Sequence, residues 1–220
     1  MAIILQGPSG NVAEMDPTWK SMRVSMRPVD HGAGGYYRIA QTSGALTATY
    51  AANAIAHAFR NSSATYTVIV WSYKWSIVVT TAFGAAQLVD NALYIGRSYS
   101  SDYGGGTAAT LSGNNCKKRT SHATIQAITY CSIANTAGLT GAPTITLDSQ
   151  PIAYRSFWAG AIGAYLADYD YTQFSPSHEM PIVLAQNEGL VLQNVTAYGA
   201  TGVVKMGVEI AWSEVPNANY

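Results

Sequence analysis

The chain carries little charge. Only 11% of its 220 residues are Asp, Glu, Lys or Arg, whereas about a quarter is usual in soluble proteins. The 12 acidic and 12 basic residues balance to a formal net charge of zero. Because a nucleic-acid-binding surface needs clustered Lys and Arg, this composition argues against a nucleic-acid binder. A surface with so few charges favours self-association or coverage by a partner, which indicates a component of an assembly.

Cysteine is also scarce. Cys116 and Cys131 are too few for a disulfide framework and lack the C-x-x-C spacing of a zinc or redox site, so we interpret them as buried or unreactive thiols. Residues 1–8 have no basic start and only a short apolar run, which predicts no export signal and folding in a reducing cytoplasm. The most apolar stretch, residues 66–83, has Lys74 in its middle and several Ser and Thr, so no membrane span is expected.

Motifs for catalysis and for metal or phosphate binding are missing too. The four histidines are scattered and none has metal-ligand spacing to another: His31, His57, His122 and His178. We therefore expect no metal site, and we expect His57 to lie in the core or on a sheet face. Residues 104–107 lack the Gly-Lys-Ser/Thr ending of a phosphate loop and are typical of a flexible turn. Asp168 and Asp170 could form an acid and base pair or bind calcium, but their alternation with tyrosines favours a solvated edge strand. The sequence therefore predicts no enzymatic activity, no cofactor and no metal site.

Strand and turn residues dominate instead. The chain has 15 Tyr, 5 Trp and 20 Gly, and much of the remainder is Ser, Thr, Ala and Asn. Period-two alternation and dense β-branched or aromatic residues predict strands over residues 22–27, 36–42, 46–50, 51–60, 66–71, 75–80, 144–147, 182–184, 189–195 and 203–212. Between Phe83 and Tyr99 the apolar spacing partly fits a helix, which predicts a short helix or an irregular excursion there.

Many short strands separated by turn residues, with no repeated strand–helix unit, predict an all-β protein. We expect an antiparallel β-sandwich, jelly-roll-like, with long loops and at most a short helix. Residues 1–17 are expected to form an extended N-terminal lead and residues 18–220 a single β-sandwich domain, because no internal repeat or linker divides the chain.

The last predicted strand alternates well between apolar and other residues. We expect one face of it to lie in the core, formed by Met206, Val208, Ile210 and Trp212. Glu209 stands on the other face. Replacing Trp212 is therefore expected to destabilise the protein far more than replacing Glu209.

The surplus of tyrosine favours an interface. Tyr and Trp combine a large contact area with a hydrogen-bonding tip and a low entropy cost. Residues 100–115 form a long loop by composition, and loops of this length are usually contact surfaces or functional. The candidate interface residues form three groups: Tyr99 and Tyr103 near this loop, the basic cluster Lys117, Lys118 and Arg119, and Tyr165, Tyr169 and Tyr171 around the two aspartates. The basic cluster is by itself typical of a solvated turn. Exposed aromatics would also suit a carbohydrate-binding module, so that alternative stays open.

Several segments resemble virion structural proteins of tailed bacteriophages, and the similarity spans nearly the whole chain. The segments are GPSGNVAEMD (7–16), RVSMRP (23–28), GTAATLSGNN (106–115), PIVLAQNEGLV (181–191) and GVEIAWSE (207–214). They are turn and strand signatures without chemistry, so they indicate a lineage rather than an activity.

The resemblance implies a non-enzymatic virion structural protein, a capsid cement or decoration protein built from many copies on the capsid surface. Its partners would be the major capsid protein or other virion proteins and copies of itself, with no nucleic acid and no membrane. The sparse charge and the many tyrosines themselves predict a homo-oligomer, a trimer by preference. Synthesis would take place in the host cytoplasm. The alternative is a tail- or head-fibre-associated structural or glycan- or receptor-binding module. A further alternative is a hydrolase of host envelope sugars that uses Asp168 and Asp170.

Overall fold

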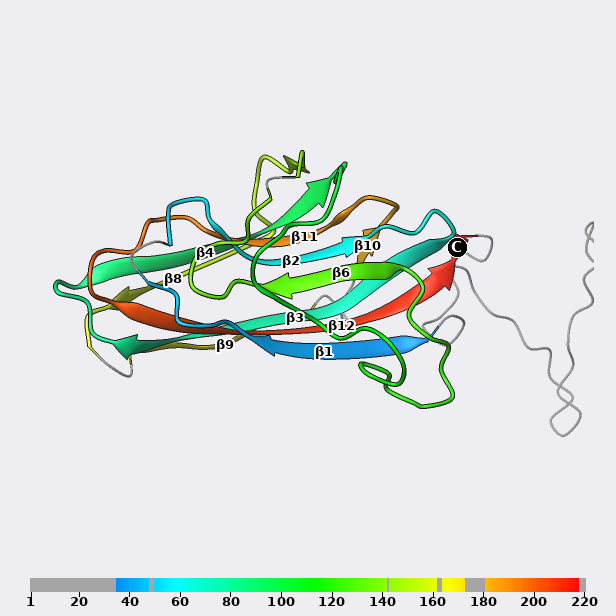
Figure 1. Ribbon diagram of the computed structural model, residues 1–220, viewed down its shortest axis with the longest axis horizontal. Helices are drawn as coiled ribbons and strands as arrows, with labels where there is room; N and C mark the ends of the chain where they lie inside the picture. The colour runs from blue at the N-terminus through cyan, green and yellow to red at the C-terminus, as the bar shows by residue number, and fades with distance from the viewer. Residues whose placement is uncertain (1–34, 48–49, 142, 162–163, 173–180, 218–220) are drawn as a thin grey trace, which may run out of the picture.

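The computed structural model describes residues 35–217 except 48–49, 142, 162–163 and 173–180, and gives residues 166–172 as backbone alone. These residues form twelve β-strands and no α-helix. Two antiparallel sheets face each other as a sandwich (Figure 1). The all-β sandwich expected from the sequence is therefore confirmed. The boundary between residues 17 and 18 and the predicted strand 22–27 lie outside the described residues.

The first sheet is built on two long strands, β3 (Tyr66–Thr81) and β12 (Val203–Pro216). They pair antiparallel along their whole length. Strand β1 (Tyr36–Thr42) pairs with the other side of β12. Two strands share the other side of β3, namely β9 (Tyr165–Thr172) and β10 (Ile182–Leu184).

The second sheet is wider. Its strand order is β5 (Thr107–Ala108), β6 (Ile128–Ile133), β2 (Ile55–Asn61), β11 (Gly189–Asn194) and β4 (Gln87–Arg97). Beyond β4, two collinear strands complete the sheet: β7 (Thr146–Leu147) and β8 (Ala153–Ala159). Figure 1 shows this sheet above the first one, with β6 crossing in front.

The eight principal strands follow the jelly-roll connection. The order β1-β12-β3-β9 in one sheet faces β2-β11-β4-β8 in the other. The chain changes sheet after each of these strands except between β4 and β8, which gives two interlocked Greek keys. The segment between β4 and β8 adds the small strands β5, β6 and β7.

The core between the sheets is aromatic at its centre. Trp212 stacks on Tyr37 with 5.5 Å between ring centroids and meets Phe59 edge-on at 5.2 Å. The alternation predicted for the last strand is confirmed, because the apolar row is buried at every position: Met206, Val208, Ile210 and Trp212.

Strand β3 was expected as two strands and is one, with an irregularity at Trp71. The register to β12 shifts there, since Ala211 stands opposite Ser72 and Trp212 opposite Val70. The extra residue changes which positions face the core. Val68 and Val70 are buried before it, and Tyr73, Trp75 and Ile77 after it.

The short helix expected between Phe83 and Tyr99 is wrong, because this stretch is strand β4. Strand β4 has neighbours on both sides, and residues 89–93 are buried on both faces. Its period-two signal is therefore lost. The strand expected over 46–50 reduces, in the described residues, to a single bridge between Leu46 and Val204. The strand expected over 51–60 is confirmed from Ile55 onward as β2, while residues 51–54 form a turn.

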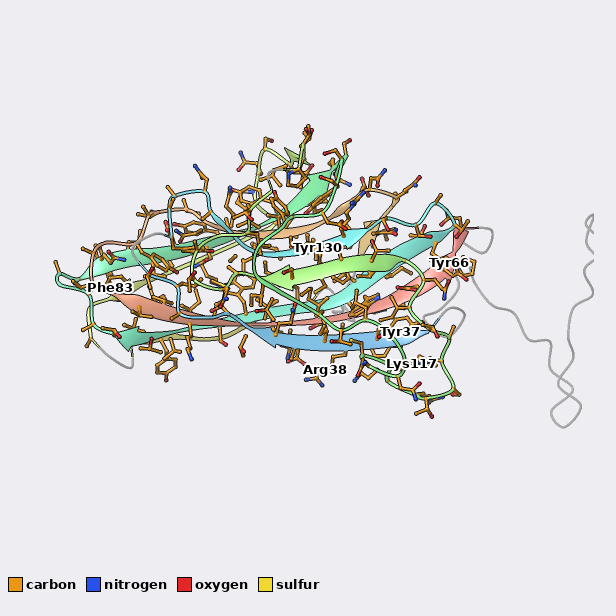
Figure 2. The ribbon with its side chains drawn as sticks, in the orientation of Figure 1. Tyr37, Arg38, Tyr66, Phe83, Lys117 and Tyr130 are labelled. Atoms are coloured by element: carbon orange, nitrogen blue, oxygen red, sulfur yellow. The ribbon has the colours of Figure 1, made fainter. Side chains whose placement is uncertain are left out.

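The segment between β4 and β8 folds back over the second sheet. A second, smaller apolar cluster holds it on the outer face, formed by Ile55, Ala58, Tyr99, Tyr103, Leu139 and Val191. The same segment covers two strand edges. Strand β5 pairs with β6, and the backbone around Lys117 pairs with β1, where Arg38 N donates to the Cys116 oxygen over 2.8 Å. Figure 2 shows Lys117 beside Tyr37 and Arg38.

The buried row of β12 gives a paired test of the register. Trp212→Ala is expected to lower the free energy of unfolding by about 3–5 kcal/mol, because it removes a large core side chain. Glu209→Gln is expected to change it by less than about 1 kcal/mol, since Glu209 lies half-buried on the outer face in an ion pair with the exposed Arg38. Equilibrium denaturation of both variants measures the two changes. A larger loss for Glu209→Gln would contradict the assigned faces.

Candidate functional site

Large apolar side chains are exposed at one side of the sandwich. In the part of the chain that the structure describes, four such residues are more than a third exposed: Val78 (39%), Tyr154 (46%), Trp158 (71%) and Tyr165 (68%). All four lie on β8, on β9 or on the part of β3 that pairs with β9. We call them the edge patch.

Strand β8 supplies the two aromatic side chains on the second sheet. Tyr154 and Trp158 share its outer face with Ser156, while Ala153, Phe157 and Ala159 turn to the core. The Tyr154 hydroxyl donates to the buried carboxylate of Asp90 over 3.0 Å. That carboxylate also accepts from the backbone N–H and the hydroxyl of Thr196. Tyr154 is therefore held in a fixed orientation on an exposed surface.

The other half of the edge patch lies on the first sheet. Tyr165 stands directly opposite Val78 in the pairing of β9 with β3. Residues directly opposite each other in an antiparallel pair lie on the same face. Strands β8 and β9 are neighbours, so both halves border the same side of the sandwich.

Two of the tyrosines predicted for the interface have a different role. Tyr99 is 2% exposed and Tyr103 is 9% exposed, and their rings meet edge-on with centroids 6.3 Å apart. The guanidinium of Arg60 lies 5.9 Å from the Tyr99 ring centroid and bonds Asp102 over 2.7 Å. Burial raises the pKa of Tyr99 well above its ordinary value. These tyrosines fasten the β4–β8 segment onto the sheet instead of presenting a surface.

The predicted basic cluster lies against β1 and is not brought together with Tyr165. Lys117 is half-buried, whereas Lys118 and Arg119 are exposed. The ammonium of Lys118 lies 5.4 Å from the ring centroid of Tyr36. Because β1 and β9 are at opposite sides of the first sheet, the basic cluster and the edge patch are separate surfaces.

The predicted residues of β9 are located by register alone. Tyr169 stands opposite Trp75 and Tyr171 opposite Tyr73, the core-facing positions of β3. Asp170 stands opposite Lys74 on the other face, and Asp168 falls at the shift in register. The side chains of these four residues lie outside the described ones, so their predicted roles stay predictions. His31 and His178 also lie outside the described residues.

Four side chains form a hydrogen-bonded network between the two sheets. The Tyr73 hydroxyl lies 3.1 Å from Nδ1 of His57, and Nε2 of His57 lies 3.4 Å from Sγ of Cys131. The Cys131 thiol donates to Oε1 of Gln41 over 3.1 Å. One arrangement satisfies every group: Tyr73 donates to Nδ1, Nε2–H donates to the sulfur, and the thiol donates to Gln41. The expectation that His57 is a core residue is confirmed.

The side chains of this hydrogen-bonded network are uncharged at ordinary pH. Burial lowers the pKa of His57 from 6.5 to about 3 and raises the pKa of the Cys131 thiol far above its ordinary value. Since reactive cysteines are accessible thiolates, Cys131 has a packing role. Cys116 is half-buried and not bonded to Cys131.

Two shallow depressions are lined by described residues. One, of about 170 Å³, lies on the outer face of the first sheet around Gly207, Thr42 and Ser76. Another, of about 330 Å³, is lined by Arg97 and Glu188 among others. Arg97 bonds Glu188 over 2.6 Å and Asp148 over 3.1 Å, which raises the pKa of its guanidinium.

Two features are absent from the described residues. Across those residues, no three His, Cys, Asp or Glu side chains lie close enough to hold a metal ion. Nor does that part of the chain contain a helix of the length and apolar character that a membrane crossing requires.

Tyr154, Trp158 and Val78 were missed by the sequence reasoning. The signal for β8 was present in part, because Tyr154, Ser156 and Trp158 form one row and Ala153, Phe157 and Ala159 stand in the other, which the exposed Arg155 interrupts. Alternation alone does not say which face is outside when both rows carry an aromatic residue.

Comparison with known proteins gives little. No protein-family model matches the chain, and no curated protein matches it. Among solved structures, the crystal structure of the infectious bursal disease virus VP2 subviral particle shares 14% identity with the chain, at a TM-score of 0.16. The match covers 93% of this chain and 46% of that one, so the chain spans less than half of its length. The resemblance to tailed-bacteriophage proteins stays a prediction.

The buried His57 makes stability depend on pH. Because its pKa is about 3 when folded and near 6.5 when unfolded, the unfolded chain takes up a proton that the folded one does not. Below pH 6.5 the free energy of unfolding should therefore fall by up to about 1.4 kcal/mol per pH unit through this residue.

The comparison variant is His57→Gln, which keeps a polar group beside Tyr73 and does not titrate. Burial raises the pKa of Glu214, although backbone N–H groups of Gln126 and Ile128 bond its carboxylate. Its protonation therefore favours the folded state as the pH falls and opposes the His57 effect. Denaturant unfolding from pH 7 to pH 4 should show a shallower acid loss in His57→Gln than in the wild type. Equal slopes would contradict the assignment.

Proposed function

We propose that the chain is a non-enzymatic structural protein of a virus particle, a capsid cement or decoration protein of the kind found in tailed bacteriophages. The edge patch is the observation that carries this proposal. It provides exposed Tyr and Trp side chains on a rigid sandwich, while the surface as a whole has few charges. Such residues dominate the binding energy of protein interfaces.

The architecture agrees with this proposal without deciding it. Jelly rolls occur in viral capsid domains and also in lectin and cupin domains, and a fold alone does not define a function. The chain adds three features that suit a particle component: zero net charge, buried titratable groups and a large packed core. The partners we propose are the major capsid protein or other virion proteins, together with copies of the chain itself.

Attachment in many copies would make modest contacts sufficient. Each copy presents the pair Val78 and Tyr165 on one sheet and Tyr154 and Trp158 on the other. Two small apolar surfaces on one rigid body can engage two neighbours at once. The proposed location is the capsid surface, reached after synthesis in the host cytoplasm.

A glycan- or receptor-binding module is the second candidate, as part of a tail or head fibre. Tyr154 and Trp158 favour it, because they project from the same face of one strand. Four residues along a strand separate them by roughly 13 Å. Planar side chains at such a spacing can stack on successive sugar rings.

The particle role is tested on the first-sheet half of the edge patch. The double variant Val78→Ser/Tyr165→Ser should weaken binding to purified particles lacking the chain by about tenfold or more, because it removes apolar contact area. Co-sedimentation measures the binding, and immunogold labelling places the wild-type chain on the head or the tail. The matched control is Lys118→Ser/Arg119→Ser, which changes the separate basic surface and should bind as the wild type does. Loss of binding in the control alone would overturn the choice of surface, and label on fibres would favour the second candidate.

The absence of catalysis is tested on β9. The double variant Asp168→Asn/Asp170→Asn should bind particles as the wild type does, because we assign these two residues no role in binding or in catalysis. Sugar release from host envelope preparations measures any hydrolysis. A release by the wild type that disappears in the double variant would overturn the non-enzymatic proposal.

A further inference from the structure

We propose that two copies of the chain pair through β8, which joins their second sheets into one continuous sheet. The proposal rests on the sequence of β8 (AYRSFWA, residues 153–159) and on its place at the side of the sheet. It does not depend on the particle role.

In the described part of the chain, β8 forms a ladder with β4 alone, while β9 of the other sheet lies near it without pairing. The ladder runs along residues 153–159, and no described strand pairs with the other side of β8. A strand at the side of a sheet presents a row of N–H and C=O groups that can pair with another chain. At the opposite side of the sandwich the β4–β8 segment covers the corresponding edges, with β5 along β6 and with residues 116–118 along β1.

The sequence of β8 is complementary to itself. An antiparallel pairing about a two-fold axis at Ser156 places Tyr154 opposite Trp158 of the second copy, and this happens twice. It also places Arg155 opposite Phe157 and Ala153 opposite Ala159. Aromatic pairs directly opposite each other stabilise antiparallel strands, and Arg can lie over an aromatic ring. The small Ala residues at the two ends leave room for the core side chains of each copy.

The neighbouring registers are worse, which makes this one specific. In an antiparallel pair of β8 strands, the outer-face residues of one copy must stand opposite outer-face residues of the other. This requires a two-fold axis perpendicular to the sheet that passes beside one residue of β8, because a shift by one position pairs outer residues with core-facing ones. An axis at Arg155 would set the two arginines against each other, a like-charge pair that destabilises the pairing. An axis at Phe157 would set Trp158 against Ser156 and separate the aromatic pairs. Among these three registers, the axis at Ser156 alone pairs all four exposed aromatic side chains.

A second copy fits this edge better than another occupant. Two exposed aromatic side chains on each copy cover each other, and the zero net charge of the chain creates no long-range repulsion between copies. Stable interfaces bury about 800 Å² per partner, and one seven-residue strand with its aromatic side chains supplies less than that. We therefore expect a dimer that dissociates on dilution. A two-fold pairing also means that the trimer preferred from composition does not arise at β8.

The register is tested by cross-linking. In a Cys116→Ser background, Ser156→Cys places two thiols opposite each other on the axis. Directly opposite Cβ atoms lie about 4.5–5.5 Å apart, and a disulfide forms when they approach to about 4.5 Å or less. Mild oxidation should convert the Ser156→Cys protein to a covalent dimer on a non-reducing gel. Thr129→Cys, an exposed position of β6 at the covered side, is the matched control and should stay monomeric. Cross-linking no faster than this control would overturn the proposal.

The equilibrium is tested by sedimentation velocity over a range of concentrations. The wild type should shift from monomer to dimer, and Ser156→Lys should weaken that dimer by about tenfold or more, since it places two like charges on the axis. Ser156 is exposed, so circular dichroism and the unfolding midpoint of this variant should match the wild type. A monomer at every concentration, or an oligomer that Ser156→Lys does not weaken, would overturn the proposal. So would glycan binding at Trp158 by a strictly monomeric protein.

Discussion

The pairing of β12 with β3 is the interaction on which the rest of the structure depends. The two strands run side by side from the Tyr66–Pro216 pair to the Thr81–Val203 pair. Strand β1 reaches the sheet through β12, and β9 and β10 reach it through β3. Their inner faces carry Trp75 and Trp212, on which the second sheet packs. The other strands of the first sheet are placed by direct pairing with these two, and the second sheet is placed by packing on their inner faces.

Protection of the edges explains why the two sides of the sandwich differ. The segment between β4 and β8 covers β6 and β1, and Tyr99 and Tyr103 anchor it on the outer face. No described strand covers β8 and β9 in the same way. Under the pairing proposed above, association would be directed to one side, and a molecule with few charges would avoid indiscriminate aggregation by limiting where its backbone can pair.

The parts of the fold that the sequence predicted are those where one face is buried and the other is not. The row ending at Trp212 was recognisable because its neighbours on β12 stay outside over residues 205–209. Strand β4 was not recognisable as a strand, because Asp90 and Ala92 are buried as well as Val89, which removes the alternation of buried and exposed residues. The candidate site was predicted in part. Tyr165 is exposed, but Tyr99 is buried by a cluster of residues distant in sequence, which composition does not encode.

The order of strands also determines when the protein can fold during synthesis. Strand β11 lies between β2 and β4, and β12 lies between β1 and β3. Strand β2 can pair earlier with β6, β4 with β8 and β3 with β9. The strands that join these pairs, β11 and β12, are complete only when residues 189–216 have left the ribosome. Pairing over such sequence distances is slow, because a long loop must close before any contact is gained. Until then the separate strand pairs of each sheet are not joined, and chaperones or rapid completion of the carboxy-terminal segment would determine the yield of native protein.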